Sequence, residues 1–99
     1  MNFRFRDEVL RRMYTELDFD GGYGRPVVRA FRKVMNAIRA AMDERDFYPM
    51  RSLHFEKLKG NRSHQRSMRL NDQWRLILEI EEATPKNTII VVGIEDYHR

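Results

Sequence analysis

The feature that most restricts the fold of this chain is a pair of short amphipathic segments within residues 66–81. Large apolar residues occupy even positions in both segments: Met68, Leu70, Trp74, Leu76, Leu78 and Ile80. Because side chains alternate between the two faces of a strand, both sets can face one core only if even positions pair with even positions. A loop of residues 71–73 meets this condition and pairs Leu70 with Trp74. The pattern predicts an antiparallel hairpin, whose regular strand is expected to begin just after Arg66.

The same register places Arg69 directly opposite Arg75 on the face away from the core. Opposed side chains have Cβ atoms about 4.5–5.5 Å apart, where like charges are destabilising. A bound anion, most plausibly phosphate, would relieve the repulsion, because guanidinium groups bind phosphate with two parallel hydrogen bonds. Alternatively, the two side chains diverge or pair with Glu56, Glu79 or Glu95.

Helical periodicity precedes the hairpin. Apolar residues recur at helical spacing after Asp7, which can cap a helix, and again after Pro26, which suits a first helical turn. Residues 3–5 could form a short edge strand, and the segment 88–95 is apolar on both faces, as in an interior strand. Helices followed by strands predict an α+β fold, in which two N-terminal helices pack on one face of an antiparallel sheet of about four strands.

The length of 99 residues predicts one domain, residues 1–99, with a modest core. The chain contains no cysteine, which excludes disulfides and thiolate metal sites. No stretch predicts a signal peptide or a membrane span, so a soluble cytoplasmic protein is expected. The separations of His54, His64 and His98 match no common ligand spacing, so we expect no metal site.

The positive charge is concentrated in one segment. Residues 51–75 carry seven Lys or Arg and two Asp or Glu, in a chain whose net charge is +4. A concentrated basic segment favours an anionic partner, with nucleic acid first, although a solvated basic loop fits equally well. A second feature is the run Asp96, Tyr97 and His98, which places an acid, a phenol and an imidazole directly after the most apolar strand.

Residues 54–81, HFEKLKGNRSHQRSMRLNDQWRLILEIE, and residues 94–98, IEDYH, together resemble the HigB group of the RelE/ParE toxin superfamily. The shared pattern is a Leu-Lys-Gly, a Ser-x-Arg-x-Asn strand, a Trp-Arg strand and a terminal Asp-Tyr-His. The resemblance implies a RelE-like fold and a toxin of a bacterial type II toxin–antitoxin system that cleaves mRNA on the translating ribosome, without a metal or other cofactor. It also implies a HigA-like helix-turn-helix antitoxin, through which alone the toxin reaches operator DNA.

Cleavage of RNA by its own 2′-hydroxyl needs a base, an acid and cations around the phosphate. Under the resemblance, His98 is the predicted acid or base, Asp96 is a base or orients His98, and Tyr97 stacks on a base or hydrogen-bonds the phosphate. Arg69 and Arg75 are the predicted phosphate clamp. Four further basic side chains are expected to contact RNA: Lys57, Lys59, Arg62 and Arg66.

One position departs from the family pattern. The family often has a histidine two positions before its Leu-Lys-Gly, where this chain has Glu56, and His54 lies two residues earlier. Either Glu56 acts as the base, or His54 moves in around a different loop, or neither is catalytic. The rival functions are a ParE-like toxin that poisons DNA gyrase by contact and an inactive relative that acts as co-repressor with its antitoxin. The Asp-Tyr-His ending and the arginine pair favour the nuclease.

Overall fold

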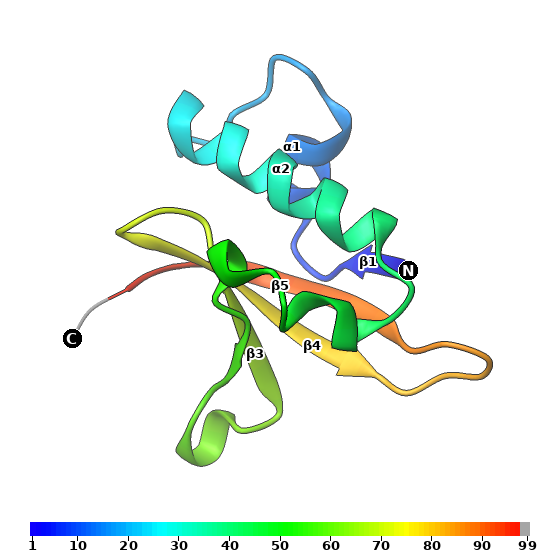
Figure 1. Cartoon of the computed structure of the whole chain (residues 1–99). Helices are drawn as coiled ribbons and strands as arrows, with labels where there is room; N and C mark the ends of the chain where they lie inside the picture. Colours follow the sequence, from blue (N-terminus) through cyan, green and yellow to red (C-terminus); the bar gives the residue numbers. More distant parts are fainter. Residues whose placement is uncertain (98–99) are drawn as a thin grey trace.

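The computed structural model describes residues 1–97, which form two helices above a five-stranded sheet (Figure 1). The helices are α1 (Glu8–Thr15) and α2 (Arg25–Ala40). The strands are β1 (Asn2–Phe5), β2 (Glu56–Lys57), β3 (Gln65–Arg69), β4 (Trp74–Glu81) and β5 (Thr88–Asp96). Three short 3-10 helices, η1 (Glu44–Phe47), η2 (Arg51–Leu53) and η3 (Gly60–Arg62), lie between α2 and β3. No helix of this part of the chain is long and apolar enough to cross a lipid bilayer.

Both helices begin at the predicted residues. The Asp7 carboxylate accepts a hydrogen bond of 3.2 Å from the backbone N–H of Leu10, and Pro26 lies in the first turn of α2. The Arg32 guanidinium donates to three carbonyls at the end of α1, those of Met13, Glu16 and Leu17. Because these carbonyls lack partners within their own helix, Arg32 both caps α1 and ties it to α2.

The sheet is mixed and five-stranded, so the expected antiparallel sheet of about four strands was wrong. Its order is β1-β5-β4-β3-β2, and β1 pairs with β5 in parallel. The chain leaves β1 through both helices and re-enters the sheet at β2, and the antiparallel steps from β2 through β3 and β4 then give β5 the direction of β1. The edge strand at residues 3–5 and the interior position of the last strand are both confirmed.

The hairpin has the predicted register. Arg69 pairs with Arg75, and the Asn71 side-chain carbonyl accepts two hydrogen bonds from backbone N–H groups of the loop, which fixes the turn. One detail differs, because Arg66 belongs to β3 and pairs with Leu78. An arginine can occupy this core-side position because its Nη1 donates to the backbone carbonyls of Ser63 and Gln65.

A β-bulge in the middle of β5 changes which residues face the core. The register between β4 and β5 advances evenly except at one step, where Val92 is the extra residue. Val91 and Ile94 both pack on the core as a result, although their positions differ in parity. Glu95 then faces the opposite side of the sheet, next to its register partner Arg75.

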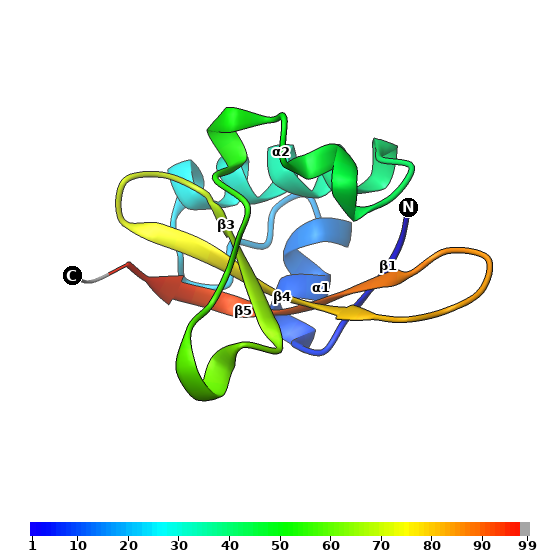
Figure 2. The same ribbon diagram turned by 60° about the horizontal axis from the view of Figure 1, so that its bottom comes forward.

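The core lies between the helices and the sheet, and the β2–η3–β3 segment extends away from the helices (Figures 1 and 2). The largest fully buried side chains of the core are Phe31, Phe47, Leu10, Met13, Met35, Ile38, Met68, Leu76, Leu78, Ile89 and Val91. The other face of the sheet is therefore left uncovered by helices.

Ion pairs cross this uncovered face next to β1. Arg6 donates to both carboxylate oxygens of Glu79, at 2.7 and 3.0 Å, and Gln65 donates to the same carboxylate at 3.0 Å. These hydrogen bonds, with Arg6 the larger contributor, lower the pKa of Glu79 from its ordinary value near 4.5 to about 2. Arg4 and Glu81 form a second pair beside them, at 2.7 Å.

We expect the protein to lose stability as the pH falls from 4.5 to 2. The unfolded chain binds a proton at Glu79 near pH 4.5, whereas the folded chain holds the carboxylate ionised until about pH 2, so the stabilisation present above pH 4.5 disappears across this window. Because Arg6 is half exposed and solvent screens the pair, the loss should be about 1–2 kcal/mol. Urea denaturation of Glu79→Gln should show a flatter pH dependence. Glu82→Gln removes one carboxylate from the exposed turn, and equal flattening in that control would contradict the assignment.

Candidate functional site

A cleft of about 230 Å³ opens on the face of the sheet away from the helices. Three segments that are far apart in the sequence line it: the β2–β3 segment, the start of β4 and the end of β5. The structure thereby brings together five of the predicted site residues, Glu56, Arg62, Arg75, Asp96 and Tyr97.

Arg75 forms the floor of this cleft. Its side chain is only 9% exposed, and its Nη1 donates to the Ser67 hydroxyl at 3.3 Å and to the His54 carbonyl at 3.4 Å. Glu56 Oε1 lies 3.5 Å from the same nitrogen, and the Tyr97 ring covers the guanidinium at 4.2 Å. A buried guanidinium is tolerated only when it is paired and hydrogen-bonded, and these contacts hold it in one orientation.

Glu56 lies between Arg75 and His54. Its Oε2 is 3.3 Å from His54 Nε2, while its other oxygen faces Arg75. His54 adopts a left-handed backbone conformation, with φ of 47°, which is unusual for a residue with a side chain and turns the chain from η2 into β2. Glu56 therefore lines the cleft, whereas His54 is outside its lining and contacts it through Glu56 and through its own carbonyl.

The turn between β3 and β4 holds the end of β5 beside the cleft. Gln73 donates from its side chain to Asp96 Oδ2 at 3.2 Å, and its carbonyl accepts a hydrogen bond from the backbone N–H of Tyr97. Asp96 and Tyr97 are thus anchored by the same residue. His98, the predicted proton-transfer residue, lies outside the described residues.

The structure does not bring the Arg69 side chain into the cleft. Arg69 lies opposite Arg75 in register, but its guanidinium turns toward the loop and pairs with Asp72. The two arginine side chains therefore diverge, as in the second interpretation of their opposition, and do not point toward one shared anion. Arg62 is the second cation of the cleft instead, and it forms a bidentate ion pair with Glu95, at 2.7 and 2.9 Å, at the rim.

Sequence reasoning missed Ser67 as a member of the cleft, and it named Glu95 only as a possible partner of Arg69 or Arg75. Ser67 is fully buried, and its hydroxyl accepts from Arg75. Its odd position in β3 was a usable signal, since it shares a face with the other odd residues of the hairpin. Glu95 carried no such signal, because the bulge at Val92 reverses the parity of β5 just before it.

The remaining basic residues lie outside the cleft lining. Lys59 is exposed just before η3, and Lys57 pairs in register with Arg66 across β2 and β3. His64 is exposed, with Nε2 3.8 Å from Glu79. Within residues 1–97, no group of three or more His, Asp or Glu side chains is arranged to hold a metal ion.

Comparison with models of known protein families shows which family the chain belongs to. A family model described as RelE-like toxin of type II toxin-antitoxin system HigB matches residues 3–98. The chain belongs to this HigB-like toxin family. The resemblance found in residues 54–81 and 94–98 is thereby confirmed, and a type II toxin implies an antitoxin as partner.

A solved structure supports the fold of this HigB-like toxin. The YoeB/ParE toxin from Agrobacterium tumefaciens superposes with a TM-score of 0.60 over 99% of this chain and 100% of that chain, at 15% sequence identity. At this identity the likeness shows the RelE-like fold alone. The search of curated proteins found no match.

Proposed function

We propose that this HigB-like toxin is a ribosome-dependent endoribonuclease that cleaves mRNA in the cytoplasm, by attack of a 2′-hydroxyl on the adjacent phosphate and without a metal ion. One observation carries the proposal: the buried Arg75 lies at the floor of a cleft that also presents the carboxylates of Glu56 and Asp96 and the ring of Tyr97. A phosphodiester bound in this cleft would have a fixed cation and proton-transfer groups around it.

The cation stabilises the charge that develops on the phosphate. A phosphodiester entering the cleft places a non-bridging oxygen against Arg75, where Glu56 Oε1 now lies 3.5 Å away. Negative charge grows on these oxygens in the transition state, and a guanidinium held in a partly desolvated position stabilises it without having to reorganise. Arg62 at the rim provides a second positive charge once it exchanges Glu95 for phosphate.

Two groups move the protons. Glu56 removes the proton of the 2′-hydroxyl, the 2′-oxygen bonds to phosphorus, and the bond from phosphorus to the 5′-oxygen breaks, which leaves a cyclic phosphate. His98 protonates the departing 5′-oxygen, with Asp96 orienting it. An imidazole suits this role because its ordinary pKa lies near neutrality, at about 6.5. His54 supports Glu56 from outside the cleft lining.

Tyr97 and the basic segment bind the rest of the RNA. One face of the Tyr97 ring rests on Arg75, and the partly exposed ring can stack on a nucleobase. Lys59, which is exposed just before η3, contacts the RNA backbone beside the cleft. A HigA-like helix-turn-helix antitoxin is the proposed inhibitor and the route to operator DNA.

The proposal is tested by expressing the chain with and without its antitoxin, alongside His98→Ala, and mapping mRNA 5′ ends. We expect new 5′ ends in translated messages from the wild-type toxin alone, and none from His98→Ala or in the presence of antitoxin. Intact messages with growth arrest and DNA damage would instead identify a gyrase poison. Absence of any arrest would identify a co-repressor.

A further inference from the structure

A second pair of like charges is opposed in this sheet, on the face that does not carry the cleft. Lys57 of β2 is the direct register partner of Arg66 of β3. The neighbouring pair, Glu56 and Ser67, lines the cleft, and side chains alternate between faces along a strand. Lys57 and Arg66 therefore lie on the core side of the sheet, where Arg66 also pairs with Leu78.

Among residues 1–97, neither cation of this pair has a carboxylate partner. None of the ion pairs found within residues 1–97 includes Lys57 or Arg66. Arg66 Nη1 donates only to the backbone carbonyls of Ser63 and Gln65, at 3.2 and 3.4 Å, and Arg66 Nε is buried without a hydrogen-bond partner in this part of the chain. Opposed like charges are unfavourable, so an anion bound between the Lys57 and Arg66 side chains would relieve their repulsion.

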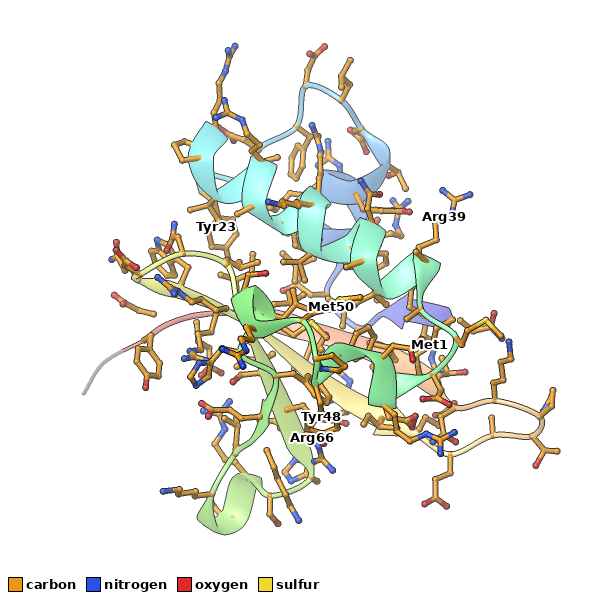
Figure 3. All side chains as sticks on the ribbon, viewed as in Figure 1. Met1, Tyr23, Arg39, Tyr48, Met50 and Arg66 are labelled. Carbon is orange, nitrogen blue, oxygen red and sulfur yellow. The ribbon has the colours of Figure 1, made fainter. Side chains whose placement is uncertain are left out.

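An exposed aromatic ring packs on Phe55, two residues before Lys57. Tyr48 is 60% exposed and packs edge-on against Phe55, with ring centroids 5.0 Å apart. Phe55 is buried in the core two residues before Lys57, which places Lys57 and Phe55 on the same side of the chain. Figure 3 shows Tyr48 and Arg66 in the same part of the molecule, below α2.

We propose that Lys57, Arg66 and Tyr48 form a second RNA-binding site, which holds a phosphodiester between the two cations and stacks a neighbouring base on the tyrosine ring. The ligand class rests on the proposed function. Cations with an adjacent exposed ring are the features that bind RNA backbone and bases without sequence preference. Because the site and the cleft lie on opposite faces of the β2–β3 pair, the RNA held here is not the scissile segment. It is ribosomal RNA or a flank of the message.

Binding measurements on the full chain test this site. The double variant Lys57→Gln/Arg66→Gln is compared with Arg29→Gln/Lys86→Gln, which removes one lysine and one arginine from exposed positions elsewhere. The probes are a fully 2′-O-methylated single-stranded RNA of about twelve nucleotides, which lacks the attacking hydroxyl, and purified ribosomes. Dissociation constants are measured over a series of salt concentrations.

We expect the site variant to bind more weakly and with a smaller salt dependence than wild type, whereas the control variant behaves like wild type. A phosphate contact contributes about 0.7 to the slope of log K against log salt for a single strand, so loss of the one phosphodiester held between the two cations should reduce the slope by about that amount. Tyr48→Ala should weaken binding without changing the slope, and because its ring is largely exposed it keeps the test valid if the double variant unfolds. If the site variant loses affinity for ribosomes but not for the oligonucleotide, the bound RNA is ribosomal RNA. If it also loses affinity for the oligonucleotide, the bound RNA is a single-stranded flank of the message.

Equal affinities and slopes for the site and control variants would overturn the proposal. So would loss of antitoxin binding with unchanged RNA binding, which would make the surface a protein interface. Because the methylated probe cannot be cleaved, this result is independent of the nuclease assay. A wild-type chain that produces no new 5′ ends would refute the proposed function, whereas unchanged binding by the site variant would refute only the second site.

Discussion

Arg75→Ala should lower the rate of mRNA cleavage on ribosomes by about 10²–10³-fold, the range observed when one fixed donor to a developing anion is removed. Arg75 is the cation that the fold holds most firmly, since Ser67, His54, Glu56 and Tyr97 all contact its guanidinium. Removal eliminates charge stabilisation at the floor of the cleft and leaves the buried Ser67 hydroxyl without this donor. Cleavage should be measured with purified ribosomes and a defined message, from single-turnover rates.

Two matched variants make this result specific. Lys86→Ala removes one positive charge from the exposed turn before β5 and should leave the rate unchanged. Arg75→Lys keeps the charge but loses the planar fork, so we expect a rate between those of wild type and Arg75→Ala. Thermal unfolding of each variant separates loss of chemistry from loss of folding. Equal rate losses in Arg75→Ala and Lys86→Ala would show that the cleft is not the site of cleavage.

Glu56→Gln should lower the cleavage rate by about 10²–10⁴-fold, the usual contribution of a general base. The amide has nearly the shape of the carboxylate but cannot accept the proton. His54→Ala should have a smaller effect, because the His54 side chain touches Glu56 and is not part of the cleft lining, while the His54 carbonyl that accepts from Arg75 is kept. Both variants are compared with wild type at saturating ribosome concentration, so that the rate reports the chemical step.

The pH dependence of the rate distinguishes the two residues further. If Glu56 is the base, the acidic limb of the wild-type profile should disappear in Glu56→Gln and remain in His54→Ala. The opposite result would identify His54 as the base and Glu56 as its support. In that case His54→Ala would lower the cleavage rate as much as Glu56→Gln does, and the acidic limb would disappear from the pH–rate profile of His54→Ala.

Several parts of this structure follow from local patterns alone. The hairpin register, and with it the opposition of Arg69 and Arg75, was predictable because a period of two requires even positions to pair with even positions and a loop of residues 71–73 then pairs Leu70 with Trp74. The helix starts at Asp7 and Pro26 were predictable because a cap depends on neighbouring residues only. Membership of the HigB-like family rested on motifs in the C-terminal half, which the family match confirms.

The direction of the charged side chains did not follow from the same patterns. Register places Arg69 and Arg75 opposite one another, but a flexible guanidinium turns toward whichever acceptor surrounds it. Asp72 in the loop draws Arg69 away, whereas Ser67, His54 and Glu56 draw Arg75 into the cleft. The sequence predicted a phosphate clamp made of Arg69 and Arg75. Of these two, only Arg75 lines the cleft, and Arg62 at the rim is the second cation there.

Tertiary structure alone decided the fifth strand and the end of β5. Parallel pairing of β1 with β5 joins residues more than eighty positions apart, so it depends on where the two helices carry the chain. The bulge at Val92 arises because Val91 and Ile94 must both reach the core, a requirement that no alternating pattern expresses. That one extra residue turns Glu95 toward Arg75. The residue types that make up the cleft were thus visible in the sequence, but their assembly depended on contacts between distant strands, which only the folded chain provides.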